Sequence, residues 1–304
     1  MSKPTLFRIW VSAARLRTLP LSVAGIVVGN ALAVDQHSFS WGLFGSTLLT
    51  AIAFQILSNF ANDYGDGVKG TDNEQRIGPK RVLQQQLLSH KALFRGIVLT
   101  AIISLGLAVT TIFLAFGADQ LANSLLFLGL ALAAIVAAYK YTAGKGAYGY
   151  HAMGDVFVFL FFGLLAVCGA YYIQTKTLNA SVWWMALTLG FLSVGVLNLN
   201  NMRDIENDTV FGKKTVATIL GLASAKKYHT LLILSGIICL GVGLAPLAQN
   251  LWQYLPLLIV IPLGVQLARM LRIKAHAAFD ALLKPLAITT FMLSLMVFAT
   301  QYFF

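Results

Sequence analysis

Long apolar runs recur along this sequence of 304 residues, and they constrain its fold more than any other feature. A helix needs about 20 apolar residues to cross a bilayer core about 30 Å thick. Single strands of this kind would leave backbone groups unpaired in lipid, so helices are expected. The nine predicted spans are residues 18–35, 41–61, 93–117, 121–139, 152–174, 183–202, 228–248, 253–272 and 285–303.

Charged residues are too few for a soluble protein. They make up 11% of the chain, whereas soluble domains carry about 25%. The sequence therefore predicts an all-α, polytopic membrane protein in which residues 1–304 form a single domain. Apolar side chains at positions 6, 9, 10, 13 and 16 have helical spacing, which indicates an amphipathic helix before the first span. Cys168 and Cys239 both lie in apolar runs, which argues against a disulfide framework.

The basic residues predict the orientation. When the spans are threaded alternately through a membrane, every Lys and Arg except Lys176 falls on the side of the N-terminus. Because cytoplasmic loops carry an excess of Lys and Arg, the N-terminus is expected in the cytoplasm. The same distribution accounts for the net charge of +11 and argues against nucleic-acid binding, since the charges lie in short loops between apolar runs.

Acidic and amide side chains follow the second span. If the helix continues past residue 61, four of them fall at positions i, i+3, i+4 and i+7, which share one helix face. Asp72 follows Gly70, where the helix is expected to break. The four residues on the shared face are Asn59, Asn62, Asp63 and Asp66.

A similar cluster follows the sixth span, and its members again step along one helix face. In the threading above, both clusters emerge on the same side of the membrane. Arg203 lies within the second cluster, and an arginine can bind two phosphate oxygens at once. The other members of this cluster are Asn200 or Asn201, Asp204 and Asp208.

The two clusters together predict a magnesium site. Carboxylate oxygens suit Mg²⁺, which proteins often share with substrate phosphates. Two facing clusters would hold such ions around a pyrophosphate group and make it a better leaving group. The alternative interpretation is a pair of solvated loop ends. Asparagines inside apolar helices favour the site, because they are costly in lipid without a partner.

Basic and aromatic residues accompany the clusters. The side chains of the basic residues are candidates for contacts to phosphate oxygens, although cations are expected on this side regardless. Tyr141 and Tyr148 either stabilise a cation on their ring faces or lie at the membrane interface as belt residues. Asp155, inside the fifth span, is either functional or paired with a lysine. The basic candidates are Lys69, Arg81, Lys213 and Lys214.

These motifs resemble those of the UbiA superfamily of intramembrane aromatic prenyltransferases, and the resemblance covers nearly the whole chain. The spacing from Asp66 to Asp72 is typical of the menaquinone branch of that superfamily. The 4-hydroxybenzoate branch has its third aspartate at the place of Gly70. The segments that carry the resemblance include Asn62-Asp63-Tyr64-Gly65-Asp66, Arg76-Ile77-Gly78-Pro79-Lys80-Arg81 and Asn201-Met202-Arg203-Asp204.

The resemblance implies a bundle of nine helices that transfers a polyprenyl group from polyprenyl diphosphate to 1,4-dihydroxy-2-naphthoate. Loss of CO₂ and pyrophosphate would give demethylmenaquinol in menaquinone biosynthesis. The resemblance further implies that the reaction needs Mg²⁺ and takes place at the cytoplasmic face of the bacterial inner membrane.

The resemblance also implies a role for each motif residue. The implied metal ligands are Asn62, Asp63, Asp66, Asp72, Asp204 and Asp208. The implied catalytic residues are Asp66, Asp72, Asp204, Asp208 and Arg203. The expected substrate-binding residues are Asn59, Asn62, Asp63, Lys69, Arg81, Tyr141, Tyr148, Asn200, Asn201, Lys213 and Lys214.

Two alternatives compete with this interpretation. A prenyltransferase of the same kind would act on another aromatic acceptor, such as 4-hydroxybenzoate. The two similar clusters, four spans apart, look like a diverged duplication, and repeated halves with intramembrane acids also fit a secondary transporter. Transporter sites lie near the middle of the bilayer, whereas these acidic residues cluster at one face, which favours the enzyme.

Overall fold

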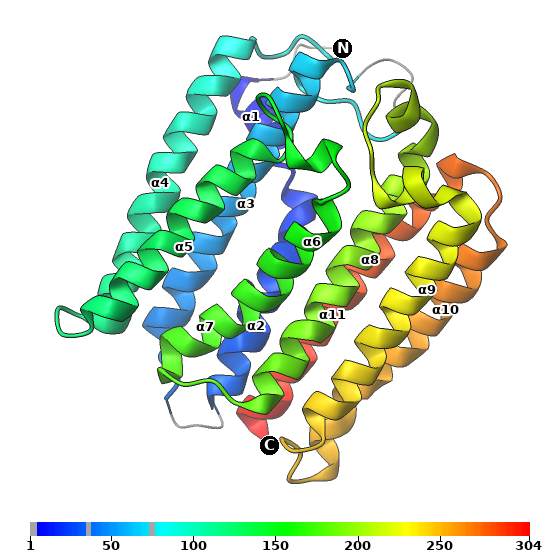
Figure 1. Ribbon diagram of the computed structural model, residues 1–304. Coiled ribbons are helices and arrows are strands. Elements are labelled where there is room, and N and C mark those ends of the chain that lie inside the picture. The colour runs from blue at the N-terminus through cyan, green and yellow to red at the C-terminus, as the bar shows by residue number, and fades with distance from the viewer. Residues whose placement is uncertain (1–4, 35–37, 73–76) are drawn as a thin grey trace. The chain divides into compact units, whose positions relative to one another are not determined.

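The computed structural model describes residues 5–34, 38–72 and 77–304. Residue 76, which belongs to one of the segments quoted above, lies outside these ranges. The helices are α1 (Leu6–Ala14), η1 (Leu16–Thr18), α2 (Leu19–Val34), α3 (Trp41–Lys69), α4 (His90–Phe116), α5 (Leu121–Lys140), η2 (Tyr148–Tyr150), α6 (Gly154–Val158), η3 (Phe159–Leu165), α7 (Ala166–Thr175), α8 (Ala180–Val210), α9 (Val216–Leu244), η4 (Leu251–Ile259), α10 (Val260–Arg272), η5 (His276–Phe279) and α11 (Asp280–Phe303). Figure 1 labels α1 to α11.

Nine helical segments within the described ranges are long and apolar enough to cross a membrane, which confirms the predicted all-α class and the number of spans. Several helices are longer than their apolar runs. The second span reaches Lys69 rather than residue 61, and the seventh begins at Val216 rather than at 228. The turns added to the second span are polar, and those added to the seventh lie before Lys226 and Lys227, which interrupt its apolar run. Hydropathy therefore locates the spans but not their polar ends.

The amphipathic helix before the first span is present as α1. The Thr5 hydroxyl accepts a hydrogen bond from the Arg8 backbone N–H at 3.4 Å, which caps the helix start. Ala13 and Ala14 are buried, whereas Leu6 and Phe7 are exposed. The helix ends at Arg15, whose φ of 51° is left-handed.

The chain divides into two compact units, each assembled from separate stretches of sequence. The first unit comprises Met1–Leu19, Leu49–Gly154 and Glu206–Thr215, and the second comprises Pro20–Leu48, Asp155–Ile205 and Val216–Phe304. In the first unit, α4 and α5 lie side by side (Figure 1). Leu57, Phe60 and Ala61 of α3 pack in its core with Leu93 and Ile97 of α4.

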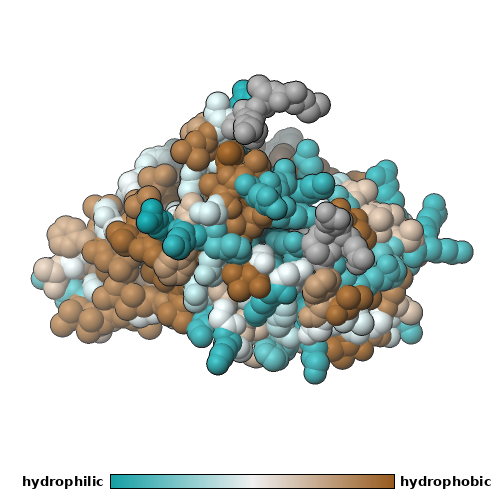
Figure 2. All heavy atoms as spheres, turned by 90° about the horizontal axis from the view of Figure 1, so that it is seen from above, coloured by the Kyte–Doolittle hydropathy of each residue, from teal (hydrophilic) through white to brown (hydrophobic). Residues whose placement is uncertain are grey.

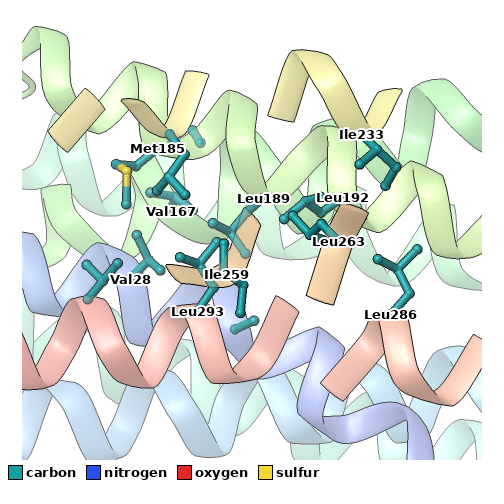
Figure 3. Close-up of a cluster of buried hydrophobic side chains, with 14 of the residues drawn as sticks. Val28, Val167, Met185, Leu189, Leu192, Ile233, Ile259, Leu263, Leu286 and Leu293 are labelled. Carbon is teal, nitrogen blue, oxygen red and sulfur yellow. The ribbon is translucent and has the colours of Figure 1, made fainter. Parts of the chain in front are cut away.

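The core of the second unit is formed by side chains from α2, α7, α8, α9, η4, α10 and α11, which converge as Figure 3 shows. Met185, Leu189 and Leu192 recur at helical spacing, so one face of α8 supplies the middle of this core. Because lipid is as apolar as leucine, van der Waals packing holds such helices together in a membrane rather than exclusion of water.

The outer surface is apolar over large areas. On α4, Leu99 is 59% exposed and Ile102 is 64% exposed. Hydrophobic residues appear brown in Figure 2, where they cover much of one side. A water-soluble protein rarely exposes patches of this size. The chain is a multi-pass membrane protein, and its exposed apolar helix faces are the surfaces that lipid covers.

Candidate active site

The end of α3 carries the first acidic cluster, as predicted. The helix continues to Lys69 and stops at Gly70, whose φ of +74° favours glycine. At Gly65 the following loop approaches α3 so closely that a Cβ atom would lie 2.4 Å from the Thr142 hydroxyl. That hydroxyl donates a hydrogen bond to the Ala61 carbonyl at 3.2 Å. These contacts place the segment 141–150, a tyrosine-rich loop with three tyrosines, against the first acidic cluster.

Tyr150 connects this loop to Asp66. Its hydroxyl donates a hydrogen bond of 2.8 Å to Asp66 Oδ1 and is also hydrogen-bonded to the Thr71 hydroxyl. Lys69 Nζ lies 3.9 Å from the centre of the Tyr150 ring. Burial, together with the negative charge of Asp66, raises the pKa of Tyr150 above its ordinary value. The hydroxyl therefore keeps its proton and remains a donor to the carboxylate.

Part of the second acidic cluster joins the same site within the first unit. The Asn207 side chain donates to the Thr71 carbonyl at 3.1 Å. Asp208 is buried, and its Oδ1 lies 3.8 Å from Lys213 Nζ. Although burial lowers the pKa of Lys213, the negative charges of Asp66 and Asp208 outweigh burial and raise it. Lys213 thus lies within electrostatic reach of a carboxylate from each motif.

The backbone on either side of Lys213 is fixed by pairing with the tyrosine loop. The Lys214 N–H donates to the Tyr150 carbonyl at 3.2 Å, and the Ala152 N–H donates to the Lys214 carbonyl at 2.8 Å. The side chain of Lys214 itself is exposed. These two bonds hold the segment after α8 in register with the loop that carries Tyr150.

Asp63 makes a separate ionic cluster in the first unit. Its side chain is 2% exposed and forms ion pairs with Arg15 and with Arg81, the latter at 3.5 Å. The two arginines belong to the end of α1 and to the segment before α4, so one buried carboxylate joins three parts of the chain. The expected role of Asp63 as a metal ligand stays a prediction.

The asparagines of α3 have protein partners too. The Asn59 side-chain amide donates to the Ala14 carbonyl at 2.8 Å and to the Thr18 hydroxyl at 3.0 Å. Asn62 Oδ1 lies 3.5 Å from the Thr142 hydroxyl, at the limit of a hydrogen bond. Asn59 therefore fastens η1 to α3, and its expected contact with substrate stays a prediction.

Arg203 is the centre of a buried network in the second unit. Its guanidinium donates two hydrogen bonds to Asp204, at 2.8 and 2.6 Å, and one to Asp280, at 2.6 Å. A further bond of 2.8 Å goes to Asn200 Oδ1, so four of the five N–H groups of the guanidinium are used. Asn201 is buried on the same helix.

The remaining candidates have simpler surroundings. The rings of Tyr141 and Tyr148 meet edge to face at 5.3 Å, and the Tyr148 hydroxyl donates to the Ala137 carbonyl at 2.9 Å. Asp72 is partly buried and follows the turn that closes α3. In the second unit, Asp155 accepts a hydrogen bond of 3.0 Å from the Tyr228 hydroxyl rather than pairing with a lysine.

The structure thus brings together Asp66, Lys69, Asp208 and Lys213 in one unit, as the two motifs predict. Sequence reasoning missed Tyr150, the residue that contacts three of these four, because the sequence singles out only Tyr141 and Tyr148 of the same loop as candidates. It also missed two partners of predicted residues. Arg15 pairs with Asp63 and Asp280 pairs with Arg203, and no local pattern signals either contact.

The donor atoms around Asp66 and Asp208 fit a hard cation. They are carboxylate and hydroxyl oxygens, which suit Mg²⁺, and the potential of the two carboxylates already raises the pKa of Lys213. Across residues 5–34, 38–72 and 77–304, no three His, Cys, Asp or Glu side chains lie close enough together to share a metal ion. The expected roles of Asp66 and Asp208 as metal ligands stay predictions.

Tyr150→Phe is expected to lower kcat/KM for an allylic diphosphate about 10- to 100-fold. The variant removes a hydrogen bond to a charged group, which is worth about 1.5–3 kcal/mol, and leaves the ring beneath Lys69. Steady-state kinetics of the purified variant measure the effect. Tyr139→Phe, in the periphery of the core of the same unit, is the matched control and should change the rate less than twofold. Equal effects of the two variants would contradict a role for the Tyr150 hydroxyl.

Comparison with known proteins identifies the family. The family model of the UbiA prenyltransferase family matches residues 22–299. A relative from Escherichia coli, named 1,4-dihydroxy-2-naphthoate octaprenyltransferase, is 39% identical over 86% of this chain and 83% of its own. A relative of the same name from Haemophilus influenzae is 42% identical over 76% of this chain and 75% of its own.

Solved structures share the fold. A UbiA homologue from Archaeoglobus fulgidus, solved bound to DMAPP and Mg²⁺, superposes with a TM-score of 0.68. The match covers 97% of this chain and 100% of that chain at 16% sequence identity. The fold and the sequence comparisons agree with the resemblance drawn from the aspartate motifs. The chain therefore belongs to the UbiA prenyltransferase family.

Proposed function

We propose that this protein transfers a polyprenyl group from polyprenyl diphosphate to 1,4-dihydroxy-2-naphthoate, with loss of CO₂ and pyrophosphate, to give demethylmenaquinol. The relatives that are 39% and 42% identical carry the name of this activity. The observation that carries the proposal is the meeting of both motifs at Lys213, whose pKa is raised by Asp66 of α3 and Asp208 of α8. Tyr150 contacts Asp66 and the two lysines, Lys69 and Lys213, at the same place.

Mg²⁺ is the metal that we propose for this site, because the donors are oxygen atoms and the A. fulgidus homologue was solved with Mg²⁺ and DMAPP. When bound, it would neutralise the diphosphate and make it a better leaving group. We assign Asp66, Asp72 and Asp208 as the main ligands, with Asn62 as a further ligand. In the second unit the Asp204 carboxylate accepts two hydrogen bonds from Arg203, and its expected role as a metal ligand stays a prediction. Asp63, paired with two arginines, is assigned instead to positioning those cations.

The protein's own side chains account for the handling of the diphosphate. Lys69 and Lys213 provide positive charge beside Asp66, and Tyr150 fixes the orientation of that carboxylate. Arg81, Arg203 and Lys214 are proposed to contact phosphate oxygens or to hold the residues that do. The electron-rich ring then forms a carbon–carbon bond to the allylic carbon from the ring carbon that carries the carboxylate, as the bond between the allylic carbon and the diphosphate oxygen breaks. The bond from that ring carbon to the carboxylate breaks next, which releases CO₂ and returns its electron pair to the ring. No side chain needs to act as a covalent nucleophile.

The membrane setting follows from the substrate. A polyprenyl chain is insoluble in water, and the exposed apolar helix faces let it remain in lipid while the diphosphate is bound at polar helix ends. We propose that the N-terminus and the site face the cytoplasm of a bacterial inner membrane, because all Lys and Arg except Lys176 fall on that side of the threading. We also propose that the two units act as a single catalytic domain, since the family model spans both.

Product formation from two acceptors tests the reaction and the acceptor together. Purified protein in detergent receives a radiolabelled allylic diphosphate with either 1,4-dihydroxy-2-naphthoate or 4-hydroxybenzoate. A lipid product and CO₂ are expected from the naphthoate only, and chelation of Mg²⁺ with EDTA should abolish both. If only 4-hydroxybenzoate gave a product, the protein would still be a prenyltransferase, but 1,4-dihydroxy-2-naphthoate would not be its acceptor. If intact protein gave no product from either, the enzymatic proposal would fail.

A further inference from the structure

The second unit contains a groove between the start of α9 and the end of α10. It has a volume of about 650 Å³, within the usual range for ligand pockets. Three lysines and several apolar side chains line it, and no carboxylate is among the lining residues. The lining residues include Lys226, Lys227, Lys274, Leu222, Leu271 and Ile273.

The three lysines differ in what they contact. Lys226 Nζ donates to the Leu271 carbonyl at 3.2 Å and to the Ile273 carbonyl, and so satisfies backbone acceptors at the end of α10. Lys227 and Lys274 are exposed, and within the described part of the chain neither has a carboxylate partner. Their two positive charges remain available to a ligand that reaches the groove.

The face of α9 that begins in the groove is apolar beyond Lys227. Leu231, Leu234 and Ile238 follow Lys227 at i+4, i+7 and i+11, so all four share one face of the helix. These three apolar side chains are 62%, 46% and 65% exposed. A cation followed along the same helix face by more than two turns of exposed apolar surface matches a molecule with an anionic head and a hydrocarbon chain.

We propose that this groove binds an anionic phospholipid. Its phosphate lies between Lys227 and Lys274, and one acyl chain runs along Leu231, Leu234 and Ile238. Basic pockets between membrane helices bind anionic headgroups in this way. Charge complementarity selects a lipid with a net negative headgroup over a zwitterionic one. A substrate diphosphate would require metal-binding carboxylates, which this lining lacks and the proposed active site has.

Lipid titration followed by native mass spectrometry tests the proposal. Delipidated full-length protein is titrated with phosphatidylglycerol and with phosphatidylcholine of the same acyl chains. Phosphatidylglycerol is expected to bind at least tenfold more tightly. Lys227→Gln/Lys274→Gln should weaken its binding about 25-fold, from about fivefold per lysine. Lys227→Arg/Lys274→Arg keeps the charge and should bind within about threefold of the parent protein.

Lys284→Gln is the matched control, because Lys284 is an exposed lysine near the start of α11 that does not line the groove. It should leave phosphatidylglycerol binding unchanged, and all variants should elute as monodisperse protein. Equal binding of the two lipids, or full binding by the double Gln variant, would overturn the proposal. Competition by inorganic phosphate at millimolar concentration would also overturn it, since a free anion would then suffice. Displacement by geranyl diphosphate without Mg²⁺ would identify a substrate subsite instead.

Discussion

Asp66→Asn is expected to lower kcat/KM for the allylic diphosphate by at least about 10³-fold. The substitution preserves the size of the side chain and an oxygen that accepts the Tyr150 hydrogen bond, but it removes the negative charge. That charge is the one that a divalent cation requires and that raises the pKa of Lys213. The rate is measured with purified protein at saturating naphthoate, over a range of Mg²⁺ concentrations. Asp208→Asn should have an effect of the same size, because Asp208 also acts on Lys213.

Glu206→Gln is the matched control for these two variants. It removes an acidic charge from the same helix as Asp208, but at an exposed position. Its rate should stay within about twofold of the parent protein, and its elution profile in detergent should be unchanged. A loss of only a fewfold in both Asp66→Asn and Asp208→Asn would refute the assignment of these carboxylates. Partial recovery of Asp66→Asn at high Mg²⁺ would support a role in metal affinity.

The sequence predicts the spans because the signal is local. Each apolar run is long enough to identify a helix by itself, and the break at Gly70 follows from a residue that tolerates a positive φ. The sequence predicts only that, if α3 continues past residue 61, its polar residues share one face. The structure shows that α3 does continue, to Lys69. The early start of α9 was not, because Lys226 and Lys227 interrupt the apolar run that hydropathy follows.

Contacts between distant segments could not be predicted in the same way. The partner of Arg203 on η5–α11, Asp280, is 77 residues away, and nothing in either segment specifies the other. The π-helical turns of η3 within the fifth span also have no local signature in the sequence. Composition predicts that buried charges need partners, but only packing decides which partner each one receives.

Two carboxylates of the first motif, on the same helix, differ in their partners. The sequence places Asp63 and Asp66 on the same face of one helix, and both are expected metal ligands. In the structure, Asp66 is partly buried beside Tyr150 and the lysines, whereas Asp63 is almost fully buried between two arginines. Neighbouring carboxylates on one helix therefore have different electrostatic surroundings. Loss of the Asp66 charge is expected to lower turnover, whereas loss of the Asp63 charge is expected to lower stability.

Asp63→Ala is expected to lower stability rather than to act only on turnover. Removing one partner from a buried ion pair typically costs about 3–5 kcal/mol, because the remaining charges are left uncompensated. Here two guanidinium groups, of Arg15 and Arg81, would lose their carboxylate. The midpoint of thermal unfolding should fall by an amount on the order of 10 °C. The midpoint is measured as the temperature at which half of the protein still elutes as a monodisperse peak in size-exclusion chromatography after heating.

Two comparisons separate this effect from a role in binding metal. Asp119→Ala removes an acidic residue from an exposed loop of the same unit and should leave the midpoint unchanged. Arg15→Gln/Asp63→Asn removes both charges of one pair, so it should be less destabilising than the sum of the two single changes. If Asp63→Ala kept the parent midpoint but lost turnover as completely as Asp66→Asn, Asp63 would be a metal ligand. A lowered midpoint, with measurable turnover at low temperature, would establish that this carboxylate holds α1, α3 and the segment before α4 together.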